Sequence, residues 1–282
     1  MVPAGLVIVA TPIGNAADIS ARALGVLRGA HVVACEDTRV TSKLFAIHGI
    51  CVPLLSYHEH NAAAQRPKIM ERLKIGETVA LVSDAGMPLI SDPGYRLVAE
   101  CIDEGFPVTC VPGPSSVTTA LALSGLPTDR FFFQGFLPAK QGARRAALES
   151  LSAIPGSLVV LESANRLAAM LEDAAAALGA RPAAVTRELT KRFEEVRRGP
   201  LDELARHYHD SGPPKGEVTV VIGPAPEETR ELDDDAIDAL LARELETSSV
   251  RDAADKIARL SGRPRRQVYS RALEILGNDG KP

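Results

Sequence analysis

The sequence lacks the features that would place the chain in a membrane or in an oxidising compartment. None of its apolar runs approaches the roughly 18 residues that a membrane-spanning helix needs. Residues 1–5 carry no basic side chain ahead of the short apolar run 6–10, so we expect no signal peptide. The four cysteines form no CxxC pair, which favours free thiols over a disulfide or zinc framework. These absences predict a cytoplasmic protein without membrane contact.

The sequence also lacks the short motifs of several common ligand sites. It has no GxGxxG of a nicotinamide or flavin site, no P-loop and no GxSxG nucleophile elbow. The motif HExxH is absent, and the histidine pairs 58/60 and 207/209 have no cysteine nearby, so we predict no metal site. Aromatic residues make up 4% of the chain, which argues against extensive base stacking on single strands. The net charge of −4 excludes a uniformly basic protein.

What the sequence does contain is an alternation of strand-length apolar runs with segments of helical period. In a first series we expect strands at 6–10, 31–35, 78–83 and 108–111, and helices at 20–28, 39–48 and 94–104. In a second series we expect strands at 131–136, 157–162, 183–187 and 217–222, and helices near 141–152, 164–178 and 200–209. The alternation in the first series predicts a parallel sheet with helices on its faces, and the two series together predict an α/β fold.

The length of 282 residues predicts more than one domain, at roughly 100–200 residues per domain. We place a boundary near residues 115–128. It divides an N-terminal α/β domain, residues 1–117, from a C-terminal α/β domain, residues 118–225.

A shift in charge after the second series predicts a separate helical tail over residues 230–282. Residues 226–247 carry nine acidic and two basic side chains, whereas residues 251–282 carry eight basic and four acidic ones. Two helices joined by the tight turn 261–264 would form a small helix-turn-helix. The tail is either a solvated helical appendage or a phosphate-binding module that presents Arg259, Arg263, Arg265, Arg266 and Arg271.

Loops rich in glycine, proline, aspartate and serine follow all four expected strands of the first series. They are residues 11–15, 36–39, 84–94 and 112–116. Ligands of open α/β sheets bind beyond the carboxyl ends of the strands, so four such loops predict a preformed pocket. Asp84 and Asp92 suit a ligand with a positive charge or hydroxyl donors, such as a sulfonium with an amino group and a ribose. Ser115 and Ser116 either only cap the following helix or mark an N-terminus that favours an anion.

Motifs in these loops and beyond them make the pattern specific. They are ATPIGNAADIS (10–20), CEDTR (35–39), YHEHN (57–61), SDAGMPLISDPG (83–94), VPGPSSVTTALALSGLP (111–127), FFFQGFLPAK (131–140), RELTKRFEEVRRG (187–199) and KGEVTVVIG (215–223). With them the chain resembles the tetrapyrrole methylase superfamily and, within it, the ribosomal RNA small subunit methyltransferase I family. The resemblance implies S-adenosylmethionine-dependent 2′-O-methylation of a cytidine in 16S ribosomal RNA, with the cofactor in a cleft between two α/β domains.

On this resemblance we assign residues to the cofactor and to RNA. The cofactor residues are Pro12, Ser83, Asp84, Ala85, Gly86, Pro88, Asp92, Ser115, Ser116, Leu161 and Glu188. The RNA-binding residues are Arg39, Lys43, His58, Asn61, Lys140, Arg144, Arg187, Arg265 and Arg266. Tyr57 either stacks on one flipped-out base or packs in the core. The expected partners are 16S ribosomal RNA in the small subunit and a second copy of the chain.

The ribose 2′-hydroxyl is a weak nucleophile, and a base that takes its proton would help. The catalytic candidates are Glu36, Asp37 and Lys191, the last only if its pKa is depressed, and His58 is a further candidate base. Glu36 and Asp37 could equally hold Arg39 or a helix start, and positioning of the substrate alone could suffice.

One segment departs from the family pattern. Family members typically have Glu, a small residue, Pro, His and Arg after the second strand of the second domain. Here Ala164 and Asn165 replace the Pro and His. No imidazole can act at this place, so Asn165 is left out of the catalytic set.

Two alternative functions share this fold or these features. One is methylation of a tetrapyrrole, which the basic tail and the motifs EDTR and RELTK argue against. The other is a non-catalytic module that binds RNA or a nucleotide.

Overall fold

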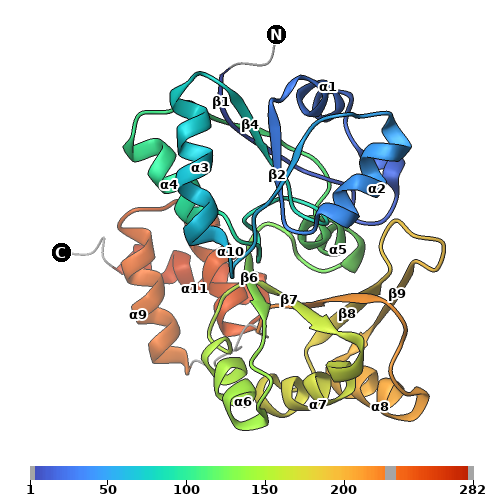
Figure 1. The fold of residues 1–282 in the computed structure, drawn as a ribbon. Coiled ribbons are helices and arrows are strands. Elements are labelled where there is room, and N and C mark those ends of the chain that lie inside the picture. Colours follow the sequence, from blue (N-terminus) through green and yellow to red (C-terminus); the bar gives the residue numbers. More distant parts are fainter. Residues whose placement is uncertain (1–3, 226–232, 279–282) are drawn as a thin grey trace. The chain divides into compact units, whose positions relative to one another are not determined.

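The computed structural model describes residues 4–225 and 233–278 (Figure 1). The chain divides into two compact units, Met1–Pro224 and Ala225–Pro282, and each is described by itself. Within the described residues, no helix is long and apolar enough to cross a membrane.

The first sheet contains five parallel strands in the order β3-β2-β4-β1-β5. The strands are β1 Gly5–Val9, β2 Val32–Cys35, β3 Leu54–Ser56, β4 Thr78–Leu81 and β5 Val108–Val111. The parallel sheet predicted from the alternating pattern is confirmed. Parallel strands end at one edge of a sheet, so the polar loops after β1, β2, β4 and β5 emerge together.

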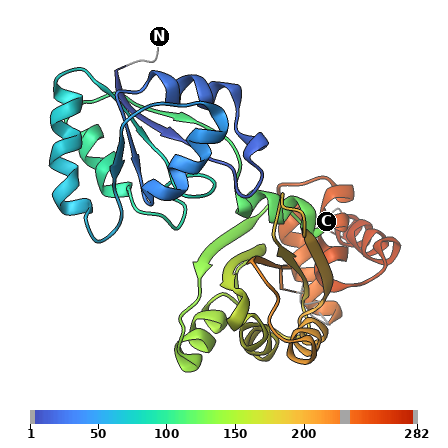
Figure 2. The ribbon, with the colours of Figure 1, turned by 45° about the vertical axis from the view of Figure 1, so that its right-hand side comes forward.

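Helices cover both faces of this sheet (Figure 2). One face packs against α1 Ala21–Gly29 and α2 Thr38–His48, and the other against α3 Ala62–Lys74 and α4 Tyr95–Asp103. Successive strand residues point to opposite faces: Val7 and Val9 pack with α1 and α2, whereas Leu6 packs with α3 and α4. Burial on both faces explains why the strands appear in the sequence as continuous apolar runs.

The second sheet is mixed and has the order β6-β7-β10-β8-β9. The strands are β6 Phe131–Phe136, β7 Ser157–Ser163, β8 Pro182–Arg187, β9 Glu195–Pro200 and β10 Glu217–Ile222. Only β6 and β7 run parallel, and the other neighbours pair antiparallel.

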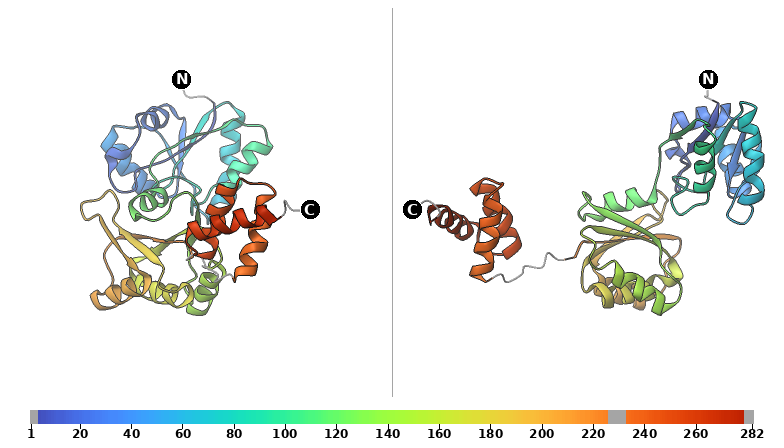
Figure 3. Two further views of the ribbon diagram at one scale, coloured as in Figure 1. Left: turned by 180° about the vertical axis from the view of Figure 1, so that it is seen from behind. Right: turned by 90° about the vertical axis from the view of Figure 1, so that its left-hand side faces the viewer.

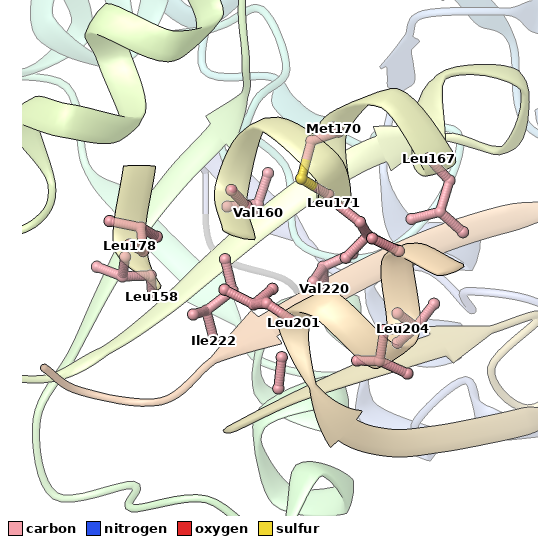
Figure 4. Packing of buried hydrophobic residues seen from close by; sticks show 14 of the residues in the cluster. Leu158, Val160, Leu167, Met170, Leu171, Leu178, Leu201, Leu204, Val220 and Ile222 are labelled. Atoms are coloured by element: carbon pink, nitrogen blue, oxygen red, sulfur yellow. The ribbon is translucent and has the colours of Figure 1, made fainter. Parts of the chain in front are cut away.

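Two layers of helix enclose this second sheet. The helices α6 Gln141–Ser150, α7 Leu167–Leu178 and α8 Leu201–Ser211 cover one face, where Val160, Leu171 and Val220 lie in a large apolar cluster (Figure 4). The other face packs against α5 Ser116–Ser124 through Val159 and Val221. The expected boundary at 115–128 spans α5, and the division into domains 1–117, 118–225 and 230–282 stays a prediction. Residues 230–232 and 279–282 of the expected tail lie outside the described residues.

The tail unit contains α9 Asp234–Leu245, α10 Val250–Ser261 and α11 Arg265–Asn278 (Figure 3). The Asp233 and Ser249 side chains cap the first two helices, and Gly262 ends α10 in the left-handed conformation with φ 66°. Ile257 and Val268 join the helices in one small apolar core. The predicted helical tail with a tight turn after α10 is confirmed.

Three elements were missing from the sequence-based expectation: β3, α3 and β9. The helix α3 carries Pro67 inside it, and β9 is an edge strand with the sequence EVRRGP. Proline in a helix and charge in a strand both argue against the element that forms. Two short 3-10 helices, η1 Ala16–Asp18 and η2 Ala164–Arg166, add single turns after β1 and β7.

Candidate active site

The loops after β1 and β4 are tied together at the carboxyl edge of the first sheet. Thr11 and Gly86 exchange backbone hydrogen bonds of 2.9 and 3.0 Å, and the Thr11 hydroxyl donates to the Ser83 carbonyl at 3.0 Å. Gly86 has φ 84°, and a Cβ there would lie 3.2 Å from the Ile13 side chain. Glycine is therefore required where these two loops meet.

A cavity of about 670 Å³ is lined by loops of both sheets. The lining residues from the first part of the chain are Ile13, Ala85 and Ser116. Those from the second sheet and its loops include Leu161, Glu162, Asn165, Thr186, Gly216 and Thr219. Three sequence-predicted cofactor residues, Ala85, Ser116 and Leu161, thus share one cavity.

The cavity fits the size and chemistry of S-adenosylmethionine. Cavities of about 300–1,000 Å³ with mostly apolar walls and a few polar groups are typical of small-ligand sites. Ser115 is the N-cap of α5 but its side chain makes no cap hydrogen bond, so the first turn of α5 offers free N–H groups beside Ser116. Those donors suit a carboxylate, and the exposed Glu217 carboxylate of the lining can accept a hydrogen bond from an amino group besides its ion pair with Lys191.

Two smaller hollows lie near this cavity, and one of them shares lining residues with it. One, of about 260 Å³, is lined by residues that include Pro12, Ser83, Ala85 and Lys191. The other, of about 490 Å³, lies over Glu36 and the start of α2. Asp84 lines both hollows, and Ala85 lines both the first hollow and the large cavity. Of the other predicted cofactor residues, Gly86, Pro88, Asp92, Ser115 and Glu188 line none of these three spaces.

The structure distinguishes the roles of Glu36 and Asp37, the neighbouring carboxylates that the sequence could not rank as bases. Asp37 is the N-cap of α2 and accepts from the Arg39 backbone N–H at 2.8 Å, and its Oδ2 pairs with Arg39 Nη2 at 2.6 Å. The side-chain hydrogen bond from Arg39 lowers the pKa of Asp37 to about 2. Burial, and then the Asp84 carboxylate, raise the pKa of Glu36. Asp37 therefore has the helix-start role that was its alternative, and Glu36 remains the candidate base of the two.

Asp84 holds the backbone of the loop that carries Glu36. Its Oδ1 accepts the Asp37 backbone N–H at 3.0 Å, which fixes the loop after β2 to the loop after β4. Burial raises the pKa of Asp84, and the nearby Asp37 carboxylate adds to this. Asp84 thus links the candidate base to the two smaller hollows.

Asp92 lies near the Glu36 and Asp84 carboxylates, and burying its own negative charge there destabilises the folded protein. Burial, and then the negative charge of Glu36, raise the pKa of Asp92 from 3.8 to about 6. Because the folded protein holds this proton more tightly than the unfolded chain, the neutral form stabilises the fold below pH 4. That contribution is lost as the pH rises from about 4 to about 6.

We therefore expect Asp92→Asn to be more stable than the wild type at pH 7. The gain is about 1–2 kcal/mol after allowance for the partial exposure of the side chain. Chemical unfolding at several pH values measures it: the difference between variant and wild type should grow between pH 4 and 6 and stay level above. A difference that is independent of pH would contradict the assigned pKa.

Lys191, the last residue of the RELTK motif, forms a network of ion pairs. Its Nζ lies 3.0 Å from Glu188 Oε1 and 2.7 Å from Glu217 Oε2. Burial lowers the pKa of Lys191, but the hydrogen bonds to Glu217 and Glu188 outweigh it and raise the pKa. The condition under which Lys191 could act as a base is not met, so we correct this assignment: Lys191 is a fixed cation.

The backbone around this network is strained and closely packed. Glu188 and Thr190 have positive φ values of 50° and 65°, a conformation that costs of order 1–3 kcal/mol in non-glycine residues. The Thr190 hydroxyl accepts the Asn15 backbone N–H at 3.1 Å, which joins this loop to the loop after β1. A Cβ on Gly14 would lie 2.5 Å from the Lys191 side chain.

Several predicted RNA contacts have other roles in the structure. Arg144 is only 5% exposed and its guanidinium pairs with the buried Asp173 at 2.6 Å, so its assignment to RNA was wrong. Asn61 shapes its own loop, where Oδ1 accepts the His58 backbone N–H at 2.8 Å. Tyr57 is 2% exposed and packs in the core, so it does not stack on a base.

The other residues of the first unit that were assigned to RNA differ in how far their side chains are exposed or already paired. Lys43 and Lys140 are exposed, and the Arg39 side chain is 86% exposed although it pairs with Asp37. Arg187 is held by Glu195 at 3.2 Å and by the Lys215 carbonyl at 3.1 Å. His58 lines the hollow over Glu36.

Sequence reasoning missed most of the cavity wall that the second sheet supplies. Glu162, Ser163, Ala164 and Asn165 line the large cavity, although Asn165 had been excluded for lack of an imidazole. Arg166 Nη2 pairs with Glu162 at 3.1 Å and donates to the Leu137 carbonyl at 2.8 Å, which fixes the end of β7. The resemblance implied that backbone groups after the strands of the second domain complete the cofactor pocket, but of these lining residues only Leu161 was named.

Comparison with known proteins agrees with the resemblance seen in the motifs. A family model described as tetrapyrrole (corrin/porphyrin) methylases matches residues 5–205, and one described as the RsmI C-terminal HTH domain matches residues 231–276. The ribosomal RNA small subunit methyltransferase I of Mesorhizobium japonicum is 49% identical over 98% of this chain and 94% of its own length. The Escherichia coli O157:H7 protein of the same name is 42% identical over 96% of each chain.

Solved structures share the fold at lower sequence identity. Uroporphyrin-III-C-methyltransferase from Thermus thermophilus matches with a TM-score of 0.57 at 21% identity, over 79% of this chain and 95% of its own. A conserved hypothetical protein from Aeropyrum pernix matches with a TM-score of 0.61 at 20% identity, over 98% of each chain. The strand-end cavity, the motifs and these matches lead to one assignment: the chain belongs to the ribosomal RNA small subunit methyltransferase I family of the tetrapyrrole methylases.

Proposed function

We propose that this methyltransferase transfers a methyl group from S-adenosylmethionine to the 2′-hydroxyl of a cytidine in 16S ribosomal RNA. The main support is the closeness of the cofactor-sized cavity to the hollow over Glu36: Ala85 lines the cavity, and its chain neighbour Asp84 lines the hollow. The names of the relatives supply the ribosomal RNA of the small subunit. We further propose that it acts in the cytoplasm, on the assembled small subunit and as a homodimer.

The cofactor is S-adenosylmethionine, and the cavity of about 670 Å³ is where we place it. When bound, it supplies an electrophilic methyl group. The free N–H groups at the start of α5, beside Ser116, would hold its carboxylate. The apolar side chains of Ile13 and Leu161 would exclude water from the remainder.

Glu36 is placed to take the proton of the acceptor hydroxyl. Burial and the Asp84 carboxylate raise its pKa, which makes it a stronger base than an ordinary glutamate. It lies in an open hollow that Arg39 and His58 also line, so a ribose-phosphate can approach both the base and a cation. The exposed Lys43 and Lys140 would add phosphate contacts that carry no sequence information.

Asp84→Asn should weaken S-adenosylmethionine binding by about tenfold, since it removes one negative charge from the hollow beside the cavity proposed for this cationic ligand. The carboxamide oxygen can still accept the Asp37 N–H, so the loop should keep its shape. Because Asp84 also raises the pKa of Glu36, the acid limb of the kcat–pH profile should move to lower pH. Isothermal titration and initial rates measure the two effects. An unchanged affinity would remove Asp84 from the cofactor site.

The proposed substrate is tested by offering three acceptors with labelled S-adenosylmethionine. These are small subunits that lack the modification, free 16S ribosomal RNA, and a reduced tetrapyrrole. We expect label in the small subunits and none in the tetrapyrrole. Label in the tetrapyrrole alone would overturn the RNA assignment, and cofactor binding without transfer to any acceptor would support a non-catalytic module.

A further inference from the structure

A basic hollow lies in the tail unit. It has a volume of about 520 Å³ and is lined by Arg251, Arg265, Arg266 and Tyr269. Arg251 lies in the first turn of α10, and the other three residues lie in the first two turns of α11, just after the tight turn. Tyr269 is 38% exposed.

Ion pairs divide the arginines of the tail into two groups. Arg271 pairs with Asp234 and Asp238, and Arg263 pairs with Asp234, so these two arginines stabilise the packing of α9. Within residues 233–278, neither Arg251 nor Arg266 forms an ion pair with a carboxylate.

The hollow therefore has an excess of positive charge. The third guanidinium of the hollow belongs to Arg265, which forms a hydrogen-bonded ion pair with Asp255. This hydrogen bond is the main cause of the lowered pKa of Asp255, and the positive charges of Arg251 and Arg259 lower it further. Three arginines against one carboxylate leave about two positive charges for a ligand to neutralise.

We propose that this hollow binds one nucleotide of ribosomal RNA, with its phosphate between Arg251 and Arg266 and its base stacked on Tyr269. The inference rests on the proposed function, which supplies RNA as the substrate. A guanidinium pair matches the oxygens of a phosphate, and a half-exposed tyrosine offers a ring face to an unpaired base. The neighbouring hollow of about 440 Å³ is less suited to an anion, because the carboxylates of Asp234 and Glu274 line it.

The proposal assigns different roles to arginines that the sequence could not distinguish. Arg266 and Arg251 contact the phosphate, Arg265 supports them through Asp255, and Arg263 and Arg271 hold the helices together. Arg243 on α9 provides a matched control, because it is exposed, lines neither hollow and forms no ion pair within the described tail.

The test compares full-length variants in their binding to small ribosomal subunits over a range of salt concentrations. Arg266→Gln should weaken binding roughly three- to tenfold and lower the slope of log K against log salt by about 1. Arg243→Gln should leave that slope unchanged. Tyr269→Leu should weaken binding by about tenfold, whereas Tyr269→Phe should keep most of the affinity because it retains the ring.

Two results would overturn this site, and neither coincides with failure of the proposed function. Wild-type affinity in both Arg266→Gln and Tyr269→Leu would exclude the hollow from RNA binding. Weaker binding with an unchanged salt slope in Arg266→Gln would exclude the phosphate contact. In both cases the wild type would still methylate the subunits, whereas a wrong function would leave the wild type without transfer.

Discussion

Glu36→Gln is expected to lower kcat for RNA methylation by at least a hundredfold while S-adenosylmethionine binds as tightly as before, within about threefold. Loss of a positioned base typically costs 10²–10⁴ in rate, on the order of what Glu36 would supply. Glutamine has nearly the same shape, and within the described residues the Glu36 side chain makes no hydrogen bond that the change would break. Single-turnover methylation and isothermal titration measure the two effects separately.

Asp37→Asn is the matched control for this variant. Asp37 caps α2 and pairs with Arg39, and its pKa of about 2 makes it a weak base. The substitution should reduce kcat much less than Glu36→Gln. If instead Asp37→Asn stopped the reaction and Glu36→Gln did not, the roles assigned to the two carboxylates would be reversed.

The pH dependence of the reaction gives an independent check on Glu36. A base must be ionised to accept a proton, so kcat should fall as the pH drops through the pKa of Glu36. Burial and the Asp84 carboxylate place that pKa above the ordinary glutamate value of 4.5. The acid limb should disappear in Glu36→Gln, and its persistence would assign the limb to another group.

Gly14→Ala is expected to weaken cofactor binding at least tenfold and to destabilise the first unit by about 1–3 kcal/mol. The added Cβ would lie 2.5 Å from Lys191 Cγ and 2.9 Å from the Leu189 carbonyl oxygen, distances at which the neighbouring loop must move. Moving it breaks the ion pairs of Lys191 with Glu188 and Glu217, and Glu217 lines the cavity. Titration with S-adenosylmethionine and chemical unfolding measure the two losses.

Gly25→Ala is a control that should raise the stability of the fold, whereas Gly14→Ala should lower it. Gly25 lies inside α1, and a Cβ there would meet no atom within 4 Å. Alanine favours a helix over glycine, so this variant should be more stable by roughly 0.5–1 kcal/mol with unchanged cofactor affinity. Similar behaviour of the two variants would show that the close approach at Gly14 has no part in shaping the cavity.

The parallel sheet and its strand-end loops could be predicted because buried strands leave a strong pattern. The strands β1, β2, β4 and β5 appear as apolar runs, and polar loops follow each of them. The strand β9 left no such pattern, since its exposed arginines conceal an edge strand.

The roles of individual charges could not be predicted, because they depend on partners that are distant in the sequence. Arg144 appeared to be a surface cation until the fold placed Asp173 beside it, 29 residues along the chain. The pKa of Lys191 depends on Glu217, 26 residues away. Asn165 looked like a lost catalytic position, yet its place after β7 puts it in the cavity wall.

The most direct test is nucleoside analysis by mass spectrometry after methylation of small ribosomal subunits that lack the modification. We predict a single new product, 2′-O-methylcytidine, formed by the wild type and nearly absent with Glu36→Gln. A methyl group on the base instead of the ribose would contradict the proposed chemistry, as would 2′-O-methylation of a different nucleoside.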